Sequence, residues 1–145
     1  MSESDGTSQE AAILIIEDDD DTASTLHSGL SGAGYVVRRA GSAEEAMVTL
    51  ESTQADLILM DLMLPDTDGL ILCSTLTARF PAPIIMLSAR VGEVDRALAL
   101  ESGAVDLLTK PVNVDELLNQ VRAVTRNQGS AVRSQRSEIR GQRSA

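Results

Sequence analysis

Five short, largely apolar runs alternate along the chain with segments in which apolar residues recur every three or four positions. The runs occupy residues 12–16, 35–37, 56–60, 83–87 and 104–108. Such alternation is typical of βα units that build a parallel sheet. Because the crossovers between parallel strands are right-handed, the pattern predicts a compact α/β three-layer sandwich with five strands and five helices.

Local signals place the ends of several helices. Ser42 with Glu45 forms a capping-box signature, and Asn113 with Glu116 is a similar one at the last helix. Gly103 is suited to the end of a helix, because glycine adopts the left-handed backbone found there. Four helices are expected to bury these residues: Ala23, Leu26, Leu30 and Ala33; Ala43, Ala46, Met47 and Leu50; Leu72, Cys73, Leu76 and Phe80; Leu117, Val121 and Val124.

The remaining helix, expected at about residues 91–102, has two sets of apolar positions. We expect Ala97, Leu100 and Ala104 to form its buried stripe. Val94 and Leu98 lie well off that stripe and predict an apolar surface for a partner.

The composition predicts one domain in a reducing compartment. A chain of 145 residues with 43% hydrophobic content can bury about two-thirds of its unfolded surface. Its one cysteine, Cys73, excludes an internal disulfide and fits a cytoplasmic protein. No apolar run approaches the roughly 18 residues of a membrane span, so we expect no contact with a membrane.

Charge divides the chain unevenly. Residues 1–121 carry six basic and 21 acidic side chains, a net charge of −15, whereas residues 122–145 carry six Arg and one Glu, a net charge of +5. An acidic globule is not expected to bind nucleic acid directly. We expect a domain at residues 11–126 between a disordered tail (1–10) and a basic, flexible tail or linker (127–145). The chain is then either a single-domain protein or part of a longer one.

Charged and hydroxyl side chains follow four of the five runs. Glu17 and Asp18 follow the first run, Asp61 the third, Ser88 ends the fourth, and Lys110 follows the fifth. The carboxyl ends of parallel strands meet in one crevice, so these groups are expected to converge. Together they would suit a divalent cation and a phosphoryl group.

Four motifs in order resemble those of the two-component response-regulator receiver domain. They are Glu-Asp at 17–18, Asp-Leu-Met-Leu-Pro-Asp-Thr-Asp-Gly at 61–69, Met-Leu-Ser-Ala at 86–89 and Leu-Thr-Lys-Pro at 108–111. The resemblance extends from residue 12 to about 126, with fitting spacings throughout. It implies the flavodoxin-like doubly wound fold, strand order 2-1-3-4-5, with the site between strands one and three.

The resemblance implies a phosphoacceptor switch in which Asp61 accepts a phosphoryl group. The donor would be a phosphohistidine on a sensor histidine kinase or a histidine phosphotransfer protein. Mg²⁺, for which Mn²⁺ can substitute, would be bound directly by Asp18, Asp61 and the backbone carbonyl of Met63, and through water by Glu17. Lys110 would pair with the phosphoryl oxygens. Such a domain catalyses only its own phosphorylation and dephosphorylation, so it is not an enzyme with a separate substrate.

The resemblance also implies that Ser88 is a switch hydroxyl that moves toward the phosphoryl group. Its usual aromatic partner is replaced by Leu107, and the Phe often found after the proline is replaced by Val112. We therefore expect the signal to pass through the backbone of the fourth helix. A cis peptide bond at Lys110-Pro111 is implied as well.

A homodimer through the fourth helix, fifth strand and fifth helix is suggested by a partial likeness to OmpR/PhoB-type regulators. Arg96 and Glu116 match one inter-subunit ion pair of those dimers. Asp106 and Glu101 match two others, but Gln120 and Asn127 stand where the basic partners are expected.

An alternative is a haloacid-dehalogenase-type phosphatase, with Asp18 as nucleophile and Asp20 as acid/base. Ser88 and Lys110 would serve there too, but this alternative leaves Asp61 unexplained. Residues 19–21 are otherwise expected only to begin a helix, where acidic residues are favoured. Asp66 and Asp68 are expected to be turn and N-cap residues rather than ligands.

Overall fold

A computed structural model of the chain describes residues 11–89 and 93–127. Five strands form one parallel sheet in the predicted order β2-β1-β3-β4-β5. They are β1 (Ala12–Ile16), β2 (Val36–Ala40), β3 (Leu57–Asp61), β4 (Ile84–Ser88) and β5 (Asp106–Thr109). The tail expected at residues 1–10 lies outside the described residues, as does the tail expected at 127–145 apart from Asn127, which is the last residue of the final helix.

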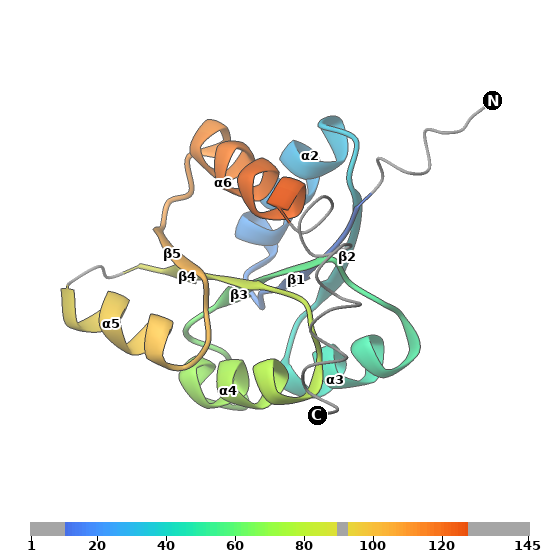
Figure 1. Cartoon of the computed structure of the whole chain (residues 1–145). Coiled ribbons are helices and arrows are strands. Elements are labelled where there is room, and N and C mark those ends of the chain that lie inside the picture. Colours follow the sequence, from blue (N-terminus) through green and yellow to red (C-terminus); the bar gives the residue numbers. More distant parts are fainter. Residues whose placement is uncertain (1–10, 90–92, 128–145) are drawn as a thin grey trace.

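Helices cover both faces of the sheet and complete the predicted three layers (Figure 1). One face is covered by α2 (Asp20–Gly32) and α6 (Val114–Asn127), and the other by α3 (Ala43–Ser52), α4 (Gly69–Arg79) and α5 (Glu93–Glu101). Among the described residues, no helix is long and apolar enough to cross a membrane.

The core consists of two apolar layers, because alternate side chains of each strand point to opposite faces of the sheet. Leu14, Ile16 and Met60 pack with residues of α3, α4 and α5. Ile13 and Ile15 pack with residues of α2 and α6. Full burial of one such side chain contributes about 1.5–3 kcal/mol, so the central strands are the best-anchored part of the molecule.

The predicted helix ends are confirmed. Ser42 Oγ accepts a hydrogen bond from the Glu45 N–H at 3.2 Å, and Asn113 Oδ1 accepts one from the Glu116 N–H at 2.9 Å. Gly103 follows α5 with φ of 115°, a left-handed backbone that glycine adopts without strain. A Cβ at Gly103 would also clash with the Thr77 side chain on α4.

Several details of the sequence-based expectations were wrong. Of the α5 residues whose side chains are described (96–101), Ala99 is the buried one, because it packs into the core cluster with strand residues, whereas Ala97 and Leu100 are exposed. Leu98 is exposed as predicted, and the side chain of Val94 lies outside the described residues. Ala33 is exposed because α2 ends at Gly32, with Ala33 as its C-cap.

The second strand also extends beyond the predicted residues 35–37. Its five residues pair with all five of β1, from Ala12 with Val36 to Ile16 with Ala40. Arg38 and Arg39 interrupt the apolar run, so the sequence does not show the full length of this strand. An edge strand tolerates such exposed charges.

Candidate functional site at the carboxyl end of the sheet

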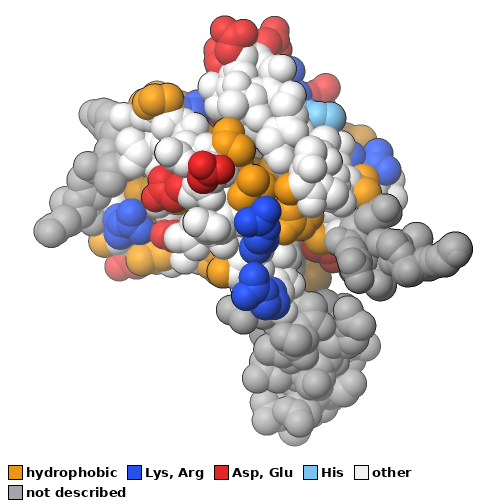
Figure 2. Space-filling view, turned by 90° about the horizontal axis from the view of Figure 1, so that it is seen from above, with side chains coloured by type: hydrophobic (Ala, Val, Ile, Leu, Met, Phe, Trp, Pro, Cys, Tyr) orange, Lys and Arg blue, Asp and Glu red, His pale blue; other side chains and the backbone are white. Residues whose placement is uncertain are grey.

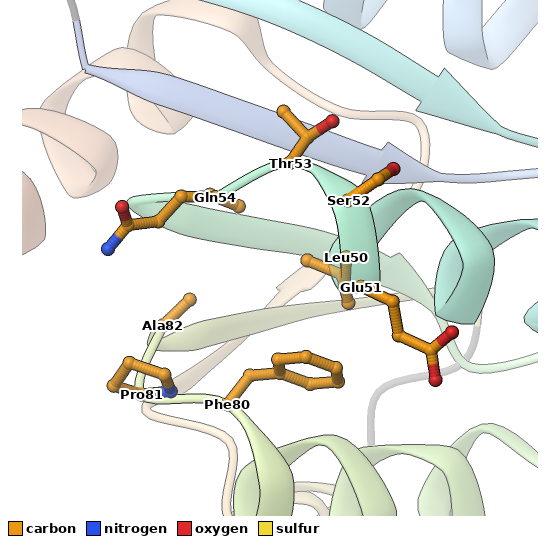
Figure 3. Close-up of a pocket in the computed structure, with 9 residues that line it drawn as sticks. Leu50, Glu51, Ser52, Thr53, Gln54, Phe80, Pro81 and Ala82 are labelled. Carbon is orange, nitrogen blue, oxygen red and sulfur yellow. The ribbon is translucent and has the colours of Figure 1, made fainter.

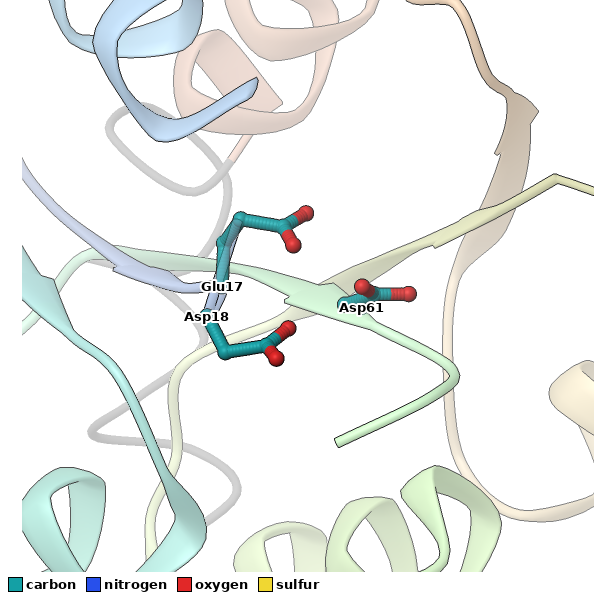
Figure 4. Close-up of side chains that lie close together, drawn as sticks. All are labelled: Glu17, Asp18 and Asp61. Carbon is teal, nitrogen blue, oxygen red and sulfur yellow. The ribbon is translucent and has the colours of Figure 1, made fainter. Parts of the chain in front are cut away.

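Three carboxylates from two neighbouring strands converge at the carboxyl end of the sheet (Figure 4). Glu17 and Asp18 directly follow β1, and Asp61 ends β3; the two strands pair in register, with Ile16 opposite Met60. One oxygen from each carboxylate lies within 4.8 Å of the others. The sequence-based prediction that these side chains would meet is therefore confirmed in its geometry.

Lys110, which directly follows β5, joins this cluster. Its Nζ lies 2.9 Å from Glu17 Oε1 and 2.9 Å from Asp61 Oδ2. Partial burial lowers the pKa of the Lys110 ammonium, but the two carboxylates outweigh this effect and raise the pKa above its ordinary value. The Lys110-Pro111 peptide bond is cis, as the resemblance implied.

The Asp61 side chain is held through both of its oxygens. Oδ1 accepts a hydrogen bond from the Met63 N–H at 3.0 Å, and Oδ2 accepts one from Lys110 at 2.9 Å. The residue is only 5% exposed. Its carboxylate is consequently oriented before any reactant arrives.

Glu17 is fully buried, which is costly for a carboxylate. The Asp19 N–H donates to Oε2 at 3.1 Å, whereas Oε1 faces Lys110 without an aligned hydrogen bond from any described residue. Desolvation raises the pKa of Glu17 to about 7; the nearby Asp61 also raises it, and Lys110 acts in the opposite direction.

This donor set fits a hard divalent cation such as Mg²⁺. Carboxylate oxygens are its preferred ligands, and Mg²⁺ usually keeps several of its waters. The buried Glu17 Oε1 has acceptor capacity to spare, and the exposed Asp18 leaves one side of the cluster open to solvent. Glu17, Asp18 and Asp61 are the residues that would hold the cation.

The two predicted switch residues, Ser88 and Leu107, lie on the neighbouring strands β4 and β5. Ser88 is buried at the end of β4 and pairs with Thr109, the residue before Lys110, whereas Leu107 is buried in β5 opposite Met86. The Lys110 N–H donates to the Ser88 carbonyl at 2.8 Å, which aligns the two strand ends. The switch role of Ser88 and Leu107, and metal binding by the Met63 carbonyl, stay predictions.

The acidic residues after Asp18 begin α2, as expected. Asp19 is the N-cap, and hydrogen bonds from the Thr22 N–H and hydroxyl hold the pKa of Asp19 below its usual range. Asp20 lies outside the carboxylate cluster and pairs with Arg39 at 2.9 Å. That placement disfavours the phosphatase alternative, which needs Asp20 as a general acid beside Asp18.

Asp68 is the N-cap of α4, as predicted, and accepts from the Leu70 N–H at 2.7 Å. Asp66 has a role that its turn-like context did not reveal. Its two carboxylate oxygens accept from the Ala43 and Glu44 N–H groups at 3.0 and 3.1 Å, so it caps α3 from a different loop. These bonds hold the pKa of Asp66 below its usual range.

The face formed by α5, β5 and α6 contains an ion pair within the chain. Arg96 donates to Asp106 Oδ1 at 2.9 Å, and Gln120 donates to Asp106 Oδ2 at 2.6 Å. Two residues that the sequence suggested as parts of different inter-subunit pairs thus bind each other here. The outer face over α2 and α6 shows hydrophobic side chains near its middle and charged ones of both signs around them (Figure 2).

A hollow of about 250 Å³ lies at the opposite, amino end of the sheet (Figure 3). It lies between the C-terminal ends of α3 and α4 and is lined by Leu50, Glu51, Ser52, Thr53, Gln54, Ala55, Phe80, Pro81 and Ala82. Arg79 pairs with Glu51 at 3.0 Å, and its guanidinium lies over the Phe80 ring. None of the sequence-predicted site residues borders this hollow.

Comparisons with known proteins agree with this geometry. The family model of the response regulator receiver domain matches residues 13–122. The sensory transduction protein RegX3 of Mycolicibacterium smegmatis is 39% identical over 115 residues, covering 79% of this chain and 50% of the relative. RegX3 of Mycobacterium tuberculosis H37Rv is 37% identical over 118 residues, covering 81% and 52%. The chain thus spans about half the length of these curated relatives.

Solved structures show the same likeness. A two-component response regulator from Clostridium difficile has a TM-score of 0.81 at 32% identity, covering 83% of this chain and all of the other. The BeF3-activated receiver domain of Klebsiella pneumoniae RstA has a TM-score of 0.75 at 29% identity, covering 79% and 98%. This chain belongs to the response regulator receiver domain family.

Proposed function

We propose that this domain is a Mg²⁺-dependent phosphoacceptor switch of a two-component or phosphorelay system, with Asp61 as the acceptor. The observation that carries the proposal is the convergence of Glu17, Asp18 and Asp61 around the Lys110 ammonium. A carboxylate held among further carboxylates and one cation is suited to accept a phosphoryl group when the charge is balanced.

In the proposed reaction an Asp61 oxygen attacks the phosphorus of a phosphohistidine on a sensor kinase or phosphotransfer protein. The new P–O bond forms as the P–N bond breaks, and the leaving imidazole keeps the electron pair and takes up a proton. The Met63 N–H and Lys110 hold Asp61 in place for this attack. Lys110 is positioned to pair with the arriving phosphoryl oxygens once it leaves Asp61 Oδ2.

Glu17, Asp18 and Asp61 would hold Mg²⁺, with the Met63 carbonyl as a further ligand. When bound, the cation neutralises charge on the carboxylates and on the transferred phosphoryl oxygens. Burial of Glu17 and the open, exposed position of Asp18 support a site that keeps water on one side.

The output would be a shift between two conformations that already exist in equilibrium. Ser88 is the group proposed to move toward the phosphoryl oxygens, and α5 follows the loop after it. With Leu107 in place of an aromatic residue, we expect displacement of the α5 backbone rather than a ring rotation to carry the signal. The domain would act in the cytoplasm, and its catalysis would be limited to its own phosphorylation and dephosphorylation.

A second copy of the chain is the partner we propose for the α5–β5–α6 face. Apolar side chains in α5 and just before β5 are exposed: Leu98, Leu100 and Val105, at 41%, 46% and 47%. Sedimentation velocity with and without beryllofluoride, a phosphoryl mimic, tests this: a larger species should form only with the mimic. A monomer under both conditions would refute dimerisation and leave the phosphoacceptor role intact.

The central test is intact mass after incubation with a small phosphodonor such as acetyl phosphate. Wild type should gain one phosphoryl group in the presence of Mg²⁺ and none in EDTA. Asp61→Asn, which is nearly isosteric, should fold normally and gain none. Donor turnover that persists in Asp61→Asn would contradict the proposal and revive a phosphatase function.

A further inference from the structure

Arg39, on the edge strand β2, contacts the turn between β1 and α2 at two places. Its Nε donates to the Glu17 carbonyl at 3.0 Å, and its Nη1 pairs with Asp20 Oδ1 at 2.9 Å. The Arg39 side chain is 34% exposed, and that of Asp20 is 90% exposed. One guanidinium therefore bridges the last residue before Asp18 and the first residue of α2.

The two contacts enclose the segment that presents the exposed carboxylate of the site. Asp18 and Asp19 lie between the two residues that Arg39 holds. On the inner side, the Glu17 N–H donates to the Ala40 carbonyl at 3.0 Å and anchors the start of the turn to β2. Arg39 adds a side-chain attachment from the same strand and fixes where the turn enters the helix.

We propose that Arg39 is a positioning residue that holds the Asp18 carboxylate in place for the divalent cation. This inference rests on the proposed function. Arg39 suits the role because its planar guanidinium offers donors in fixed directions, so it can bind a carbonyl and a carboxylate at once. Lysine carries the same charge on a flexible stem and has no such fork.

Charge alone would give Arg39 the opposite effect. A cation near a divalent metal site repels the metal, and a cation near a helix N-terminus is disfavoured by the helix dipole. An exposed ion pair such as Arg39–Asp20 is also worth little by itself. If Arg39 acted only through its charge, its removal would strengthen Mg²⁺ binding. If it acts by positioning, its removal weakens binding.

Arg38 provides a matched control on the same strand. Its side chain lies on the other side of β2, where it lines a small hollow with Thr49 and Leu50 rather than the β1–α2 turn. Arg38→Gln changes the net charge as Arg39→Gln does, without touching the turn. Comparing the two variants separates charge from position.

The test is Mg²⁺ affinity, measured by isothermal titration calorimetry on wild type, Arg39→Gln, Arg39→Lys and Arg38→Gln. We expect both Arg39 variants to bind Mg²⁺ about tenfold more weakly, the loss typical of an outer residue that orients a ligand. Arg38→Gln should bind like wild type. The inference would be overturned if Arg39→Gln bound Mg²⁺ more tightly than wild type, or if Arg39→Lys bound it as tightly as wild type. It would also be overturned if Arg38→Gln lost as much Mg²⁺ affinity as Arg39→Gln. Absence of Mg²⁺ binding by wild type would instead overturn the proposed metal site.

The rate of Asp61 phosphorylation at different Mg²⁺ concentrations gives a second readout. Arg39 does not touch the phosphoryl-accepting carboxylate, so Arg39→Gln should be slow at low Mg²⁺ and reach the wild-type rate at saturating Mg²⁺. A rate defect that persists at saturation would indicate general structural damage and overturn the positioning role.

Discussion

The two ends of the parallel sheet differ in how they use polar groups. At the carboxyl end, Glu17, Asp61 and Ser88 are the buried polar or charged residues of the described chain. At the amino end the hollow next to the ends of α3 and α4 is bordered by Glu51, Ser52 and Gln54, whose side chains are exposed. The carboxyl end, where charged groups are buried, is therefore the end suited to chemistry.

The difference arises from strand direction. At the amino end, β2 to β5 each enter the sheet from a loop that follows a helix. At the carboxyl end, side chains from β1, β3, β4 and β5 point into one crevice at the place where the strand order reverses. Burying the Glu17 and Asp61 carboxylates side by side near one lysine lowers stability, so this end is suited to binding rather than to holding the fold together.

Asp18→Ala should produce the largest change at the carboxyl end. An outer-sphere residue typically contributes 10–100-fold to metal affinity, so the loss of a direct ligand should weaken Mg²⁺ binding by more than about 100-fold. Calorimetric titration measures this directly, with Asp21→Ala, an exposed residue in the first turn of α2, as control. Equal Mg²⁺ affinities in the two variants would remove Asp18 from the metal site.

Glu17→Gln should stabilise the metal-free protein. A carboxyl whose folded pKa is raised makes the folded state bind more protons than the unfolded state, so stability falls as pH rises from about 4.5 to about 7. At pH 8 in EDTA the free energy of unfolding of the variant should exceed that of wild type by roughly 3 kcal/mol, because the pKa rises from 4.5 to about 7 and each pKa unit corresponds to about 1.4 kcal/mol.

Chemical denaturation at pH 5 and pH 8 checks this expectation, and the gain should shrink at pH 5. In saturating Mg²⁺ the advantage should disappear or reverse, because wild type gains binding energy that the variant lacks. A destabilised variant in EDTA at pH 8 would mean that Glu17 is stabilising without a cation.

Asp66→Asn should change how stability depends on pH. The pKa of Asp66 is lowered by the Ala43 and Glu44 N–H groups, so its stabilising effect is present above the unfolded pKa and is lost as pH falls through the folded one. The stability difference between wild type and variant should therefore narrow on acidification below about pH 4. Denaturation curves from pH 7 to pH 3 test this, with Asp115→Asn in α6 as a control. A difference in unfolding free energy between wild type and Asp66→Asn that did not change with pH would contradict the capping role.

Arg79→Ala at the amino end should have the smallest effect. The ion pair with Glu51 is exposed, and the contact with the Phe80 ring is also at the surface. The variant should lose less than about 1 kcal/mol of unfolding free energy and keep wild-type Mg²⁺ affinity and phosphorylation. A clear loss of Mg²⁺ affinity or of phosphorylation would show that the amino and carboxyl ends of the sheet are coupled.

Much of this molecule was predictable because its strands have one simple pattern. Fully buried strands such as β3 and β4 are continuous apolar runs, and the residues that follow them must meet at one edge. That reasoning placed Asp61, Ser88 and Lys110 correctly. It failed for α5, where a nine-residue helix with apolar residues on two sides left its buried face ambiguous.

Contacts between segments far apart in the chain could not be predicted from the sequence. Asp66 looks like an ordinary turn residue, and nothing near it in the sequence indicates that it caps α3, 22 residues earlier at Glu44. Arg39 looks like a surface charge on an edge strand, and only the folded β1–β2 pairing brings it to Glu17. Such roles depend on tertiary geometry rather than on local pattern.

The sharing of Lys110 between Glu17 and Asp61 has a consequence for what a partner can detect. Three carboxylates and one ammonium leave a formal charge of −2, which a bound divalent cation would cancel. An acyl phosphate carries about two negative charges where the carboxylate carried one, so phosphorylation of the loaded site changes its charge by only about one. A protein that distinguishes the two states should therefore respond to the arrangement of α5 and its neighbouring loops, and its preference should be nearly insensitive to salt.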